Sequence, residues 1–309
     1  MLTKSGIKLG IGLPQAFSDG RMDIEVVERI ARRSEEMGFD DLWVVEQIVG
    51  TVPVLEPLTM LSYVAAITSR VRLGTSVLVT NLRNPVQLAK ALSSLDHLSR
   101  GRVIAGIGLG TNDEAYDAFG VPTERRVSRF VEGVEVMRAL WTQSQAQHDG
   151  RIWHLDGTSM EPKPVQQPSI PLWFGARAPA SLTRAVDMAD GWMGAGSTSI
   201  ADFIEQIASV RSLLAERGRD ESAFGLSKRV YMAVDTNADR AKERMREWVG
   251  AFYGNPALAD RWAVTGTPDQ ILRVLESLRD AGAQHLLLNP VFDYDNQLDL
   301  IASEIAPAL

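Results

Sequence analysis

Side chains able to do nucleophilic, metal or acid–base chemistry are few in this sequence. Its 309 residues include no cysteine, which excludes disulfides, thiolate nucleophiles and cysteine-ligated metals. No Gly-x-Ser-x-Gly nucleophile elbow occurs, and the histidines do not have the spacing of a metal site. The four histidines are His97, His148, His154 and His285. We predict no metal site, structural roles for His97 and His285, and either solvated or substrate-facing positions for His148 and His154.

Glycine and other small residues are concentrated in short segments that could bind a flat or phosphorylated ligand. Without a Cβ the backbone can approach a ligand closely, and its free N–H groups can face an anion. Two such segments are Gly108-Leu109-Gly110-Thr111 and Gly175-Ala176-Arg177-Ala178. The first lacks the spacing of the Rossmann fingerprint, and these glycines could equally serve only to turn the chain.

The second segment leads directly from an expected strand into an expected helix, with Pro179 suited to the first helical turn. A phosphate there would meet free N–H groups, the positive end of the helix and the Arg177 guanidinium. The alternative is that Arg177 is a surface arginine after a tight turn. Among the carboxylates near one early strand, only Glu46 is placed to face a site, and we expect it to pair with an arginine of a neighbouring strand.

The elements that must position these residues alternate between short β-branched runs and helical periodicity. Expected strands run over residues 7–13, 41–45, 71–79, 102–107, 172–174, 191–193, 224–234 and 285–288. Expected helices run over residues 23–31, 58–68, 86–98, 127–140, 180–188, 201–217, 238–253, 268–281 and 298–305. Strands joined by helical crossovers run parallel in a buried sheet.

Eight strands are the number that closes a barrel, so we predict a single α/β domain over residues 1–309, a (β/α)8 TIM barrel. An open doubly wound sheet is the alternative. Residues 143–171 interrupt the alternation after the fourth βα unit with turn signals and four prolines, which indicates an inserted hairpin and extended loop over one face of the barrel. Reactive groups should lie at the carboxyl ends of the strands.

The composition narrows the partners. A net charge of −7 and an isoelectric point near 5.3 argue against nucleic acid. No run approaches the ~20 apolar residues of a membrane helix, and the first 14 residues lack a signal-peptide pattern. We expect a cytoplasmic protein that acts on a small molecule and has neither a membrane nor a nucleic-acid partner.

Several weak motifs occur in an order that resembles the luciferase-like flavin-dependent family, especially the branch that uses the deazaflavin coenzyme F420. The resemblance covers nearly the whole chain. The motifs are Gly38-Phe39-Asp40-Asp41-Leu42-Trp43, Leu73-Gly74-Thr75-Ser76-Val77, Asn84-Pro85-Val86-Gln87-Leu88-Ala89-Lys90, Leu95-Asp96-His97-Leu98-Ser99-Arg100-Gly101-Arg102, Gly120-Val121-Pro122, Leu140-Trp141, Pro162-Lys163-Pro164 and Ala189-Asp190-Gly191-Trp192.

The resemblance implies a non-prolyl cis peptide at Ser76-Val77 behind the cofactor ring. It also implies that the cofactor phosphate and linker lie along residues 108–111 and 175–178. A homodimer through the helices after the second and third strands is implied as well. Residues Leu58, Met60, Leu61 and Tyr63 form an apolar stripe on the first of these helices.

Two positions depart from the family pattern. Many F420-using members have histidine where this chain has Gln47, and the sugar-phosphate dehydrogenases have glutamate where it has Thr111. Neither Gln47 nor Thr111 titrates at neutral pH, although both can form hydrogen bonds to a cofactor or substrate. They remain the candidate catalytic residues, with Gln47 and Thr111 also counted as cofactor contacts, but we do not expect sugar-phosphate oxidation by an acid–base pair.

The chemistry expected is therefore that of the cofactor, with hydride passing between F420 and a small organic substrate. Of 32 lysine and arginine residues only six are lysine, a bias of GC-rich genomes, in which actinobacterial deazaflavin enzymes abound, and this favours F420. An FMN-dependent monooxygenase is the first alternative. A barrel of the same family that has lost its activity is the second.

Overall fold

The computed structural model describes residues 2–17, 20–110 and 113–309, and in these ranges eight parallel strands close into a barrel. Neighbouring strands in the barrel follow the chain order, and the last strand pairs with the first, Lys8 lying beside His285. The strands are β1 (Lys8–Gly12), β2 (Asp41–Val44), β3 (Arg72–Thr75), β5 (Val103–Gly108), β8 (Leu172–Gly175), β9 (Gly191–Gly194), β10 (Gly225–Val234) and β12 (His285–Pro290). The predicted TIM barrel is confirmed and the open sheet is wrong.

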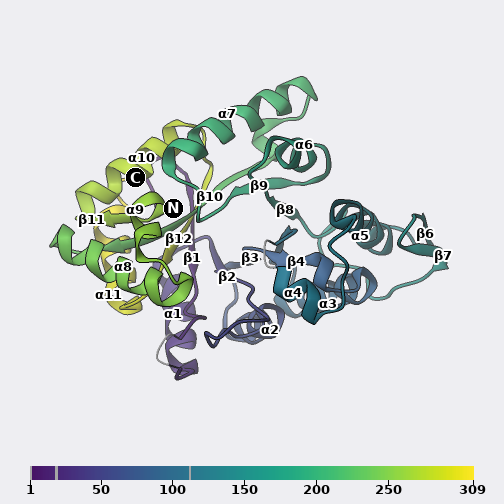
Figure 1. Cartoon of the computed structure of the whole chain (residues 1–309), viewed down its shortest axis with the longest axis horizontal. Coiled ribbons are helices and arrows are strands. Elements are labelled where there is room, and N and C mark those ends of the chain that lie inside the picture. The colour runs from purple at the N-terminus through teal and green to yellow at the C-terminus, as the bar shows by residue number, and fades with distance from the viewer. Residues whose placement is uncertain (1, 18–19, 111–112) are drawn as a thin grey trace.

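Helices cover the outside of the barrel (Figure 1). The main ones are α1 (Ile24–Met37), α2 (Pro57–Ile67), α3 (Pro85–Ser99), α5 (Arg126–Thr142), α6 (Pro179–Met188), α7 (Ile200–Glu216), α8 (Ala238–Tyr253), α10 (Pro268–Asp280) and α11 (Tyr294–Leu300). Local signals explain their ends: Gly38 stops α1 with a left-handed φ of 92°, and Pro179 opens α6. None of the helices built from the described residues has both the length and the apolar character of a bilayer span.

Short elements add to this pattern. The predicted strand 71–79 is split into β3 and β4 (Leu78–Val79), and α4 (Asp113–Ala118) and α9 (Ala259–Trp262) were not expected. Nor was β11 (Val264–Gly266), which pairs with the last three residues of β10, beyond the point where β9 has ended. A strand of three residues is too short to show the alternation of apolar and polar residues by which strands are recognised in a sequence.

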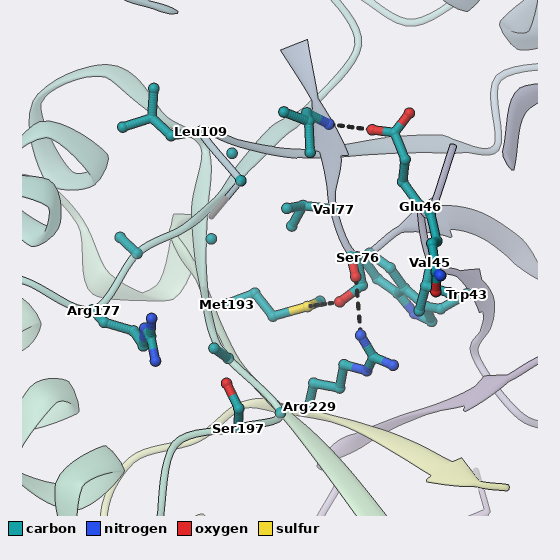
Figure 2. Close-up of a pocket in the computed structure, with 18 of the residues that line it drawn as sticks. Trp43, Val45, Glu46, Ser76, Val77, Leu109, Arg177, Met193, Ser197 and Arg229 are labelled. Carbon is teal, nitrogen blue, oxygen red and sulfur yellow. Dashed lines mark hydrogen bonds between the residues drawn. The ribbon is translucent and has the colours of Figure 1, made fainter. Parts of the chain in front are cut away.

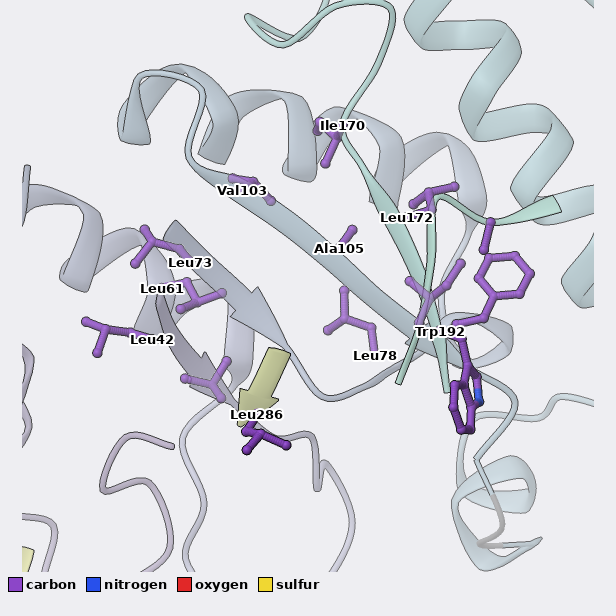
Figure 3. Close-up of a cluster of buried hydrophobic side chains, with 14 of the residues drawn as sticks. Leu42, Leu61, Leu73, Leu78, Val103, Ala105, Ile170, Leu172, Trp192 and Leu286 are labelled. Carbon is purple, nitrogen blue, oxygen red and sulfur yellow. The ribbon is translucent and has the colours of Figure 1, made fainter. Parts of the chain in front are cut away.

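The core between the strands and helices is aliphatic (Figure 3). Leu61 of α2 lies beside Leu42 of β2 and Leu73 of β3, and the three side chains are fully buried. Burying each side chain stabilises the fold by roughly 1.5–3 kcal/mol relative to leaving it in water. This layer fixes the helices against the barrel wall.

Two tryptophans fill the barrel interior. The rings of Trp43 and Trp173 lie 5.6 Å apart, and strand glycines face them. A Cβ at Gly74 would stand 2.3 Å from the Trp43 ring, and one at Gly225 would stand 2.5 Å from the Trp173 ring. The interior is therefore a packed layer that closes the barrel below its carboxyl end.

A buried polar network lies in the same interior. Asp41 accepts hydrogen bonds from Trp43 Nε1 and, at 3.0 Å, from Arg72, and it contacts His285 Nε2 at 2.8 Å. His285 Nδ1 lies 2.6 Å from Ser227 Oγ. Burial alone would raise the pKa of Asp41, but His285, Arg72 and the indole N–H outweigh it and hold the pKa at about 2. The structural role predicted for His285 is confirmed.

Residues 143–171 form the hairpin β6 (Ala146–Asp149) and β7 (His154–Thr158), followed by an extended segment. Side-chain hydrogen bonds anchor that segment to α3 and α5. Lys163 Nζ donates to the Leu140 carbonyl of α5, and Ser93 Oγ of α3 donates to the Pro162 carbonyl. In Figure 1 the hairpin lies at the outer edge beyond α5. The predicted hairpin and extended segment are present, but the hairpin lies beside α5 and not over a face of the barrel.

The apolar stripe on α2 is used mainly by the chain itself. Met60 and Leu61 are buried under α2, whereas Tyr63 is 41% exposed and donates to Glu28. A homodimer through α2 and α3 stays a prediction. We expect light scattering at micromolar concentration to give twice the mass of the chain, because Tyr63 and half-buried Leu58 leave apolar surface on this face. A monomeric mass would contradict this.

A second prediction concerns Asp41. A carboxyl whose pKa falls from 3.8 to about 2 on folding adds roughly 2 kcal/mol of stability above pH 4, which is lost as the pH falls from 4 toward 2. Asp41→Asn should therefore unfold at lower urea concentration at pH 7, and the gap from wild type should narrow as the solution is acidified. Asp149→Asn, which changes a 96%-exposed carboxylate, is the control and should track wild type. A gap that is independent of pH would refute this role.

Candidate active site

A cavity of about 780 Å³ opens at the carboxyl ends of the barrel strands. Every predicted cofactor contact that the structure describes lines it. These residues are Gln47, Ser76, Val77, Gly108, Leu109, Gly110, Gly175, Ala176, Arg177 and Ala178. Thr111 lies outside the described residues. The structure thus brings together segments that are up to 131 positions apart in the sequence, at the end of the barrel where a (β/α)8 enzyme has its site.

The peptide bond between Ser76 and Val77 is cis, as the family resemblance implies. Ser76 lies at the centre of the cavity floor (Figure 2), where its hydroxyl donates to the Met193 sulfur at 3.1 Å. Its carbonyl accepts a hydrogen bond of 3.1 Å from Arg229. The hydroxyl and the carbonyl of Ser76 are thereby held, and the Val77 side chain faces the cavity beside it.

The glycines that end β5 and β8 make room for Val77. A Cβ at Gly108 would stand 2.9 Å from one Val77 methyl, and a Cβ at Gly175 would stand 3.0 Å from the other. Gly110 has a φ of 70°, the left-handed region that favours glycine. These glycines therefore shape the floor around Val77 as well as turning the chain, a packing reason that the sequence does not show.

Glu46 is a structural anchor at the side of the cavity. One carboxylate oxygen accepts from the Val79 N–H and the other from Arg83, so Glu46 ties β4 to the loop after β2. Burial raises the pKa of Glu46, and Arg83 opposes that rise. The expected ion pair is confirmed, but Arg83 follows a 3-10 turn (Thr80–Leu82) instead of lying on a strand.

Arg229 is the principal residue that the sequence analysis missed. Its guanidinium donates to Ser76, to Asn289 Oδ1 at 2.9 Å and to the Tyr231 hydroxyl at 2.6 Å, and it points into the cavity (Figure 2). Inward positions alternate along β10 as Ser227, Arg229 and Tyr231, a period of two that could have revealed it. Arg229 lies in the middle of its strand, away from the carboxyl ends at which barrel geometry predicts reactive groups.

Three of the arginines that line the cavity lack carboxylate partners among the described residues. Among the described residues, no Asp or Glu side chain forms an ion pair with Arg177, Arg184 or Arg229, although all three line the cavity. Arg177 is exposed and follows β8, and Arg184 lies one turn into α6. Unpaired guanidinium groups around a concave site favour an anionic ligand.

Lys228, the neighbour of Arg229, points to the outside of the barrel. Its Nζ donates to the carbonyls of Ala195 and Thr198, the latter at 2.9 Å, and so holds the loop after β9. Burial, followed by the charge of Arg229, lowers the Lys228 pKa to about 7. This loop contributes Gly196 and Ser197 to the cavity, so a buried amine supports one of its walls.

Aromatic side chains form one wall of the cavity. Tyr231 of β10 and Trp248, Phe252 and Tyr253 of α8 all line the cavity. The rings of Trp248 and Phe252 are stacked 5.0 Å apart, and the ring of Tyr253 packs edge-on against Tyr231 at 6.3 Å. Helical spacing in 248–253 predicted the helix, but not that this face would turn toward a site.

Of the remaining candidate residues, Gln47 lies at the cavity and the histidines do not. Gln47 lines the cavity, and no hydrogen bond of its amide is seen within the described part of the chain. His148 and His154 lie on the hairpin and do not line the cavity. The alternative prediction that they face a substrate there is therefore wrong. His97 bonds the Lys163 carbonyl at 2.8 Å, a structural contact. The described residues bring no three His, Asp or Glu side chains into a metal-binding group.

Comparison with known proteins identifies the family. The profile described as luciferase-like monooxygenase matches residues 3–285, most of the chain. The chain belongs to this family. An uncharacterized protein of Mycobacterium tuberculosis is 38% identical over 187 residues, which cover 60% of this chain and 64% of that protein. The matched region thus spans less than two thirds of that relative.

Other luciferase-like proteins match over greater length. The F420-dependent glucose-6-phosphate dehydrogenase of Kineococcus radiotolerans is 27% identical, covering 90% of this chain and 91% of its own. Among solved structures, an F420-dependent secondary alcohol dehydrogenase with an F420-acetone adduct gives a TM-score of 0.84 at 20% identity, covering 97% of this chain and 98% of that one. Monooxygenase RslO1 from Streptomyces bottropensis gives 0.84 at 22%, with the same coverage. These structures show the luciferase-like fold.

The fit of Val77 between two glycines yields a prediction. Gly108→Ala places a methyl group 2.9 Å from Val77, which must shift, and we expect a loss of about 1–3 kcal/mol in the free energy of unfolding. Gly133→Ala is the control, because its new Cβ would meet only Pro85 at 3.7 Å, and inside α5 it should be neutral or stabilising by up to about 1 kcal/mol. Urea unfolding measures both. A Gly108→Ala variant as stable as wild type would show that the cavity floor around Val77 is loosely packed.

Proposed function

We propose that this luciferase-like protein is an oxidoreductase that transfers hydride between coenzyme F420 and a small organic substrate. The observation that carries the proposal is a cavity lined by three arginines, Arg177, Arg184 and Arg229, that have no carboxylate partner among the described residues. Such a cavity suits a cofactor that joins a flat ring to a phosphate-bearing tail. Relatives named for F420 support the choice of cofactor.

The chain's own residues fit this cofactor in two places. Ser76 and Val77 offer an immobile surface for the ring, since Ser76 is held by Met193 and Arg229. Residues 108–110 and 175–178 would take the phosphate and linker, with Arg177 supplying positive charge. When bound, F420 supplies the hydride chemistry.

Gln47 and Thr111 keep their proposed roles as hydrogen-bonding residues near the reacting groups. Neither is an acid or base at neutral pH, so sugar-phosphate oxidation by that pair is not part of the proposal. If the substrate is a carbonyl compound, its reduction needs a proton donor, and this donor must be a residue other than Gln47 or Thr111.

Two alternatives remain with this fold. An FMN-dependent monooxygenase is supported by the fold shared with RslO1 and with an FMN-bound Baeyer-Villiger monooxygenase. A non-catalytic barrel is motivated by the residues at positions 47 and 111. Oxidation of reduced cofactor that depends on added enone or ketone would eliminate the non-catalytic barrel.

The cofactor itself is tested by fluorescence titration with F420 and, separately, with FMN. We expect micromolar binding of F420, and about tenfold weaker binding by Arg177→Gln, since a charge-assisted hydrogen bond contributes roughly 1.5 kcal/mol or more. Arg273→Gln, an exposed arginine on α10 outside the cavity, is the matched control and should bind as wild type does. Binding of FMN alone would replace this proposal with the monooxygenase.

A further inference from the structure

A chain of hydrogen bonds leads from the cavity floor to its aromatic wall. Arg229 donates both to the Ser76 carbonyl at 3.1 Å and to the Tyr231 hydroxyl at 2.6 Å, and Tyr231 Oη lies 2.7 Å from Tyr253 Oη. Three contacts therefore connect the floor, through one guanidinium, to the Tyr253 hydroxyl. Of these two phenols, Tyr231 is only 4% exposed and Tyr253 is 41% exposed.

The direction of the last hydrogen bond follows from burial. A guanidinium can only donate, so the Tyr231 oxygen accepts from Arg229. The buried Tyr231 hydrogen then needs an acceptor, and within the described residues the Tyr253 oxygen is the one in reach. Reversing the bond would leave that buried hydrogen without an acceptor, which is unfavourable. The Tyr253 oxygen thus accepts, and its own hydrogen is free to point into the cavity.

Burial raises the pKa of the Tyr253 phenol, whereas the positive charge of Arg229 opposes that rise and favours proton donation along this chain. The cation lies 4.5 Å from the Tyr231 ring centroid and is hydrogen-bonded to its hydroxyl. Negative charge that develops on Tyr253 would be stabilised by the Tyr231 hydrogen bond and, through it, by Arg229. Trp248 and Phe252 beside it form a stacked apolar surface that suits the body of an aromatic or apolar substrate.

We infer that Tyr253 is the proton donor of this site and that its substrates are carbonyl compounds with an aromatic or apolar body. The inference rests on the proposed function. The substrate carbonyl carbon accepts the hydride of the reduced cofactor, and its oxygen takes the Tyr253 proton as the carbon–oxygen double bond becomes single. The substrate leaves as the alcohol, the cofactor is oxidised, and Tyr253 regains a proton from solvent. Arg229 and Tyr231 are positioning residues.

The test compares Tyr253→Phe with wild type in three measurements. Fluorescence titration with F420 should give the same dissociation constant for both. Reduction of acetophenone by reduced F420 should fall about 100-fold or more in kcat for the variant, as general-acid catalysis contributes 10²–10⁴-fold. Infrared difference spectra of carbonyl-labelled acetophenone, bound with oxidised F420, should place the carbonyl stretch at lower wavenumber in wild type, because only there does it accept the Tyr253 hydrogen bond.

Two further variants keep the test decisive. Tyr231→Phe retains the Tyr253 hydroxyl, so the infrared shift should remain while kcat falls about tenfold through loss of one hydrogen bond. Tyr63→Phe, which removes an exposed hydroxyl on α2, should leave all three measurements unchanged. Thermal melts check the folding of each variant.

The outcomes separate this inference from the proposed function. An unchanged carbonyl stretch and an unchanged kcat in folded Tyr253→Phe would overturn the role of Tyr253 while F420 binding stands. Wild-type protein that binds no F420 would instead overturn the proposed function, and the infrared comparison without cofactor would still report whether Tyr253 contacts the carbonyl.

Discussion

The filling of the barrel interior by Trp43 and Trp173 is the constraint on which the site depends. Two indoles 5.6 Å apart fit inside eight strands only because the facing positions, Gly74 and Gly225 among them, carry no Cβ. The packed layer closes the lower part of the barrel and leaves the cavity open at the carboxyl ends of the strands. Ser76, Met193 and Arg229 form the floor of that cavity, so any movement of the indole layer would move the residues above it.

Charge is distributed unequally along the barrel axis. Below, Asp41 and its partners neutralise each other, and at the side Glu46 is matched by Arg83. In the cavity, Arg177, Arg184 and Arg229 have no acidic partner within the described part of the chain and leave a positive field in a protein whose net charge is −7. The local sign is opposite to the global one, which is how a concave site can attract an anion to an acidic protein.

Much of the architecture could be predicted from sequence because it depends on local periodicity and stop signals. Alternating strands and helices, Gly38 at the end of α1 and Pro179 at the start of α6 all carry their own information. The cavity lining at strand ends followed from barrel geometry. Arg229 and Tyr253 did not, because their importance comes from which residues lie opposite them across the barrel. The packing of Gly108 and Gly175 against Val77 is likewise a relation between three strands that no single segment encodes.

The length of β10 has an evolutionary consequence. Its first residues pair with β9 as part of the closed ring, whereas Met232 to Val234 pair with β11, and α8 follows from this extension. The part of the aromatic wall that α8 supplies therefore stands on a projection, while Tyr231 and the cavity floor belong to the ring itself. Mutation or insertion in the projection can reshape this wall without disturbing barrel closure. Members of one lineage could in this way change the shape of the cavity while inheriting an unchanged floor.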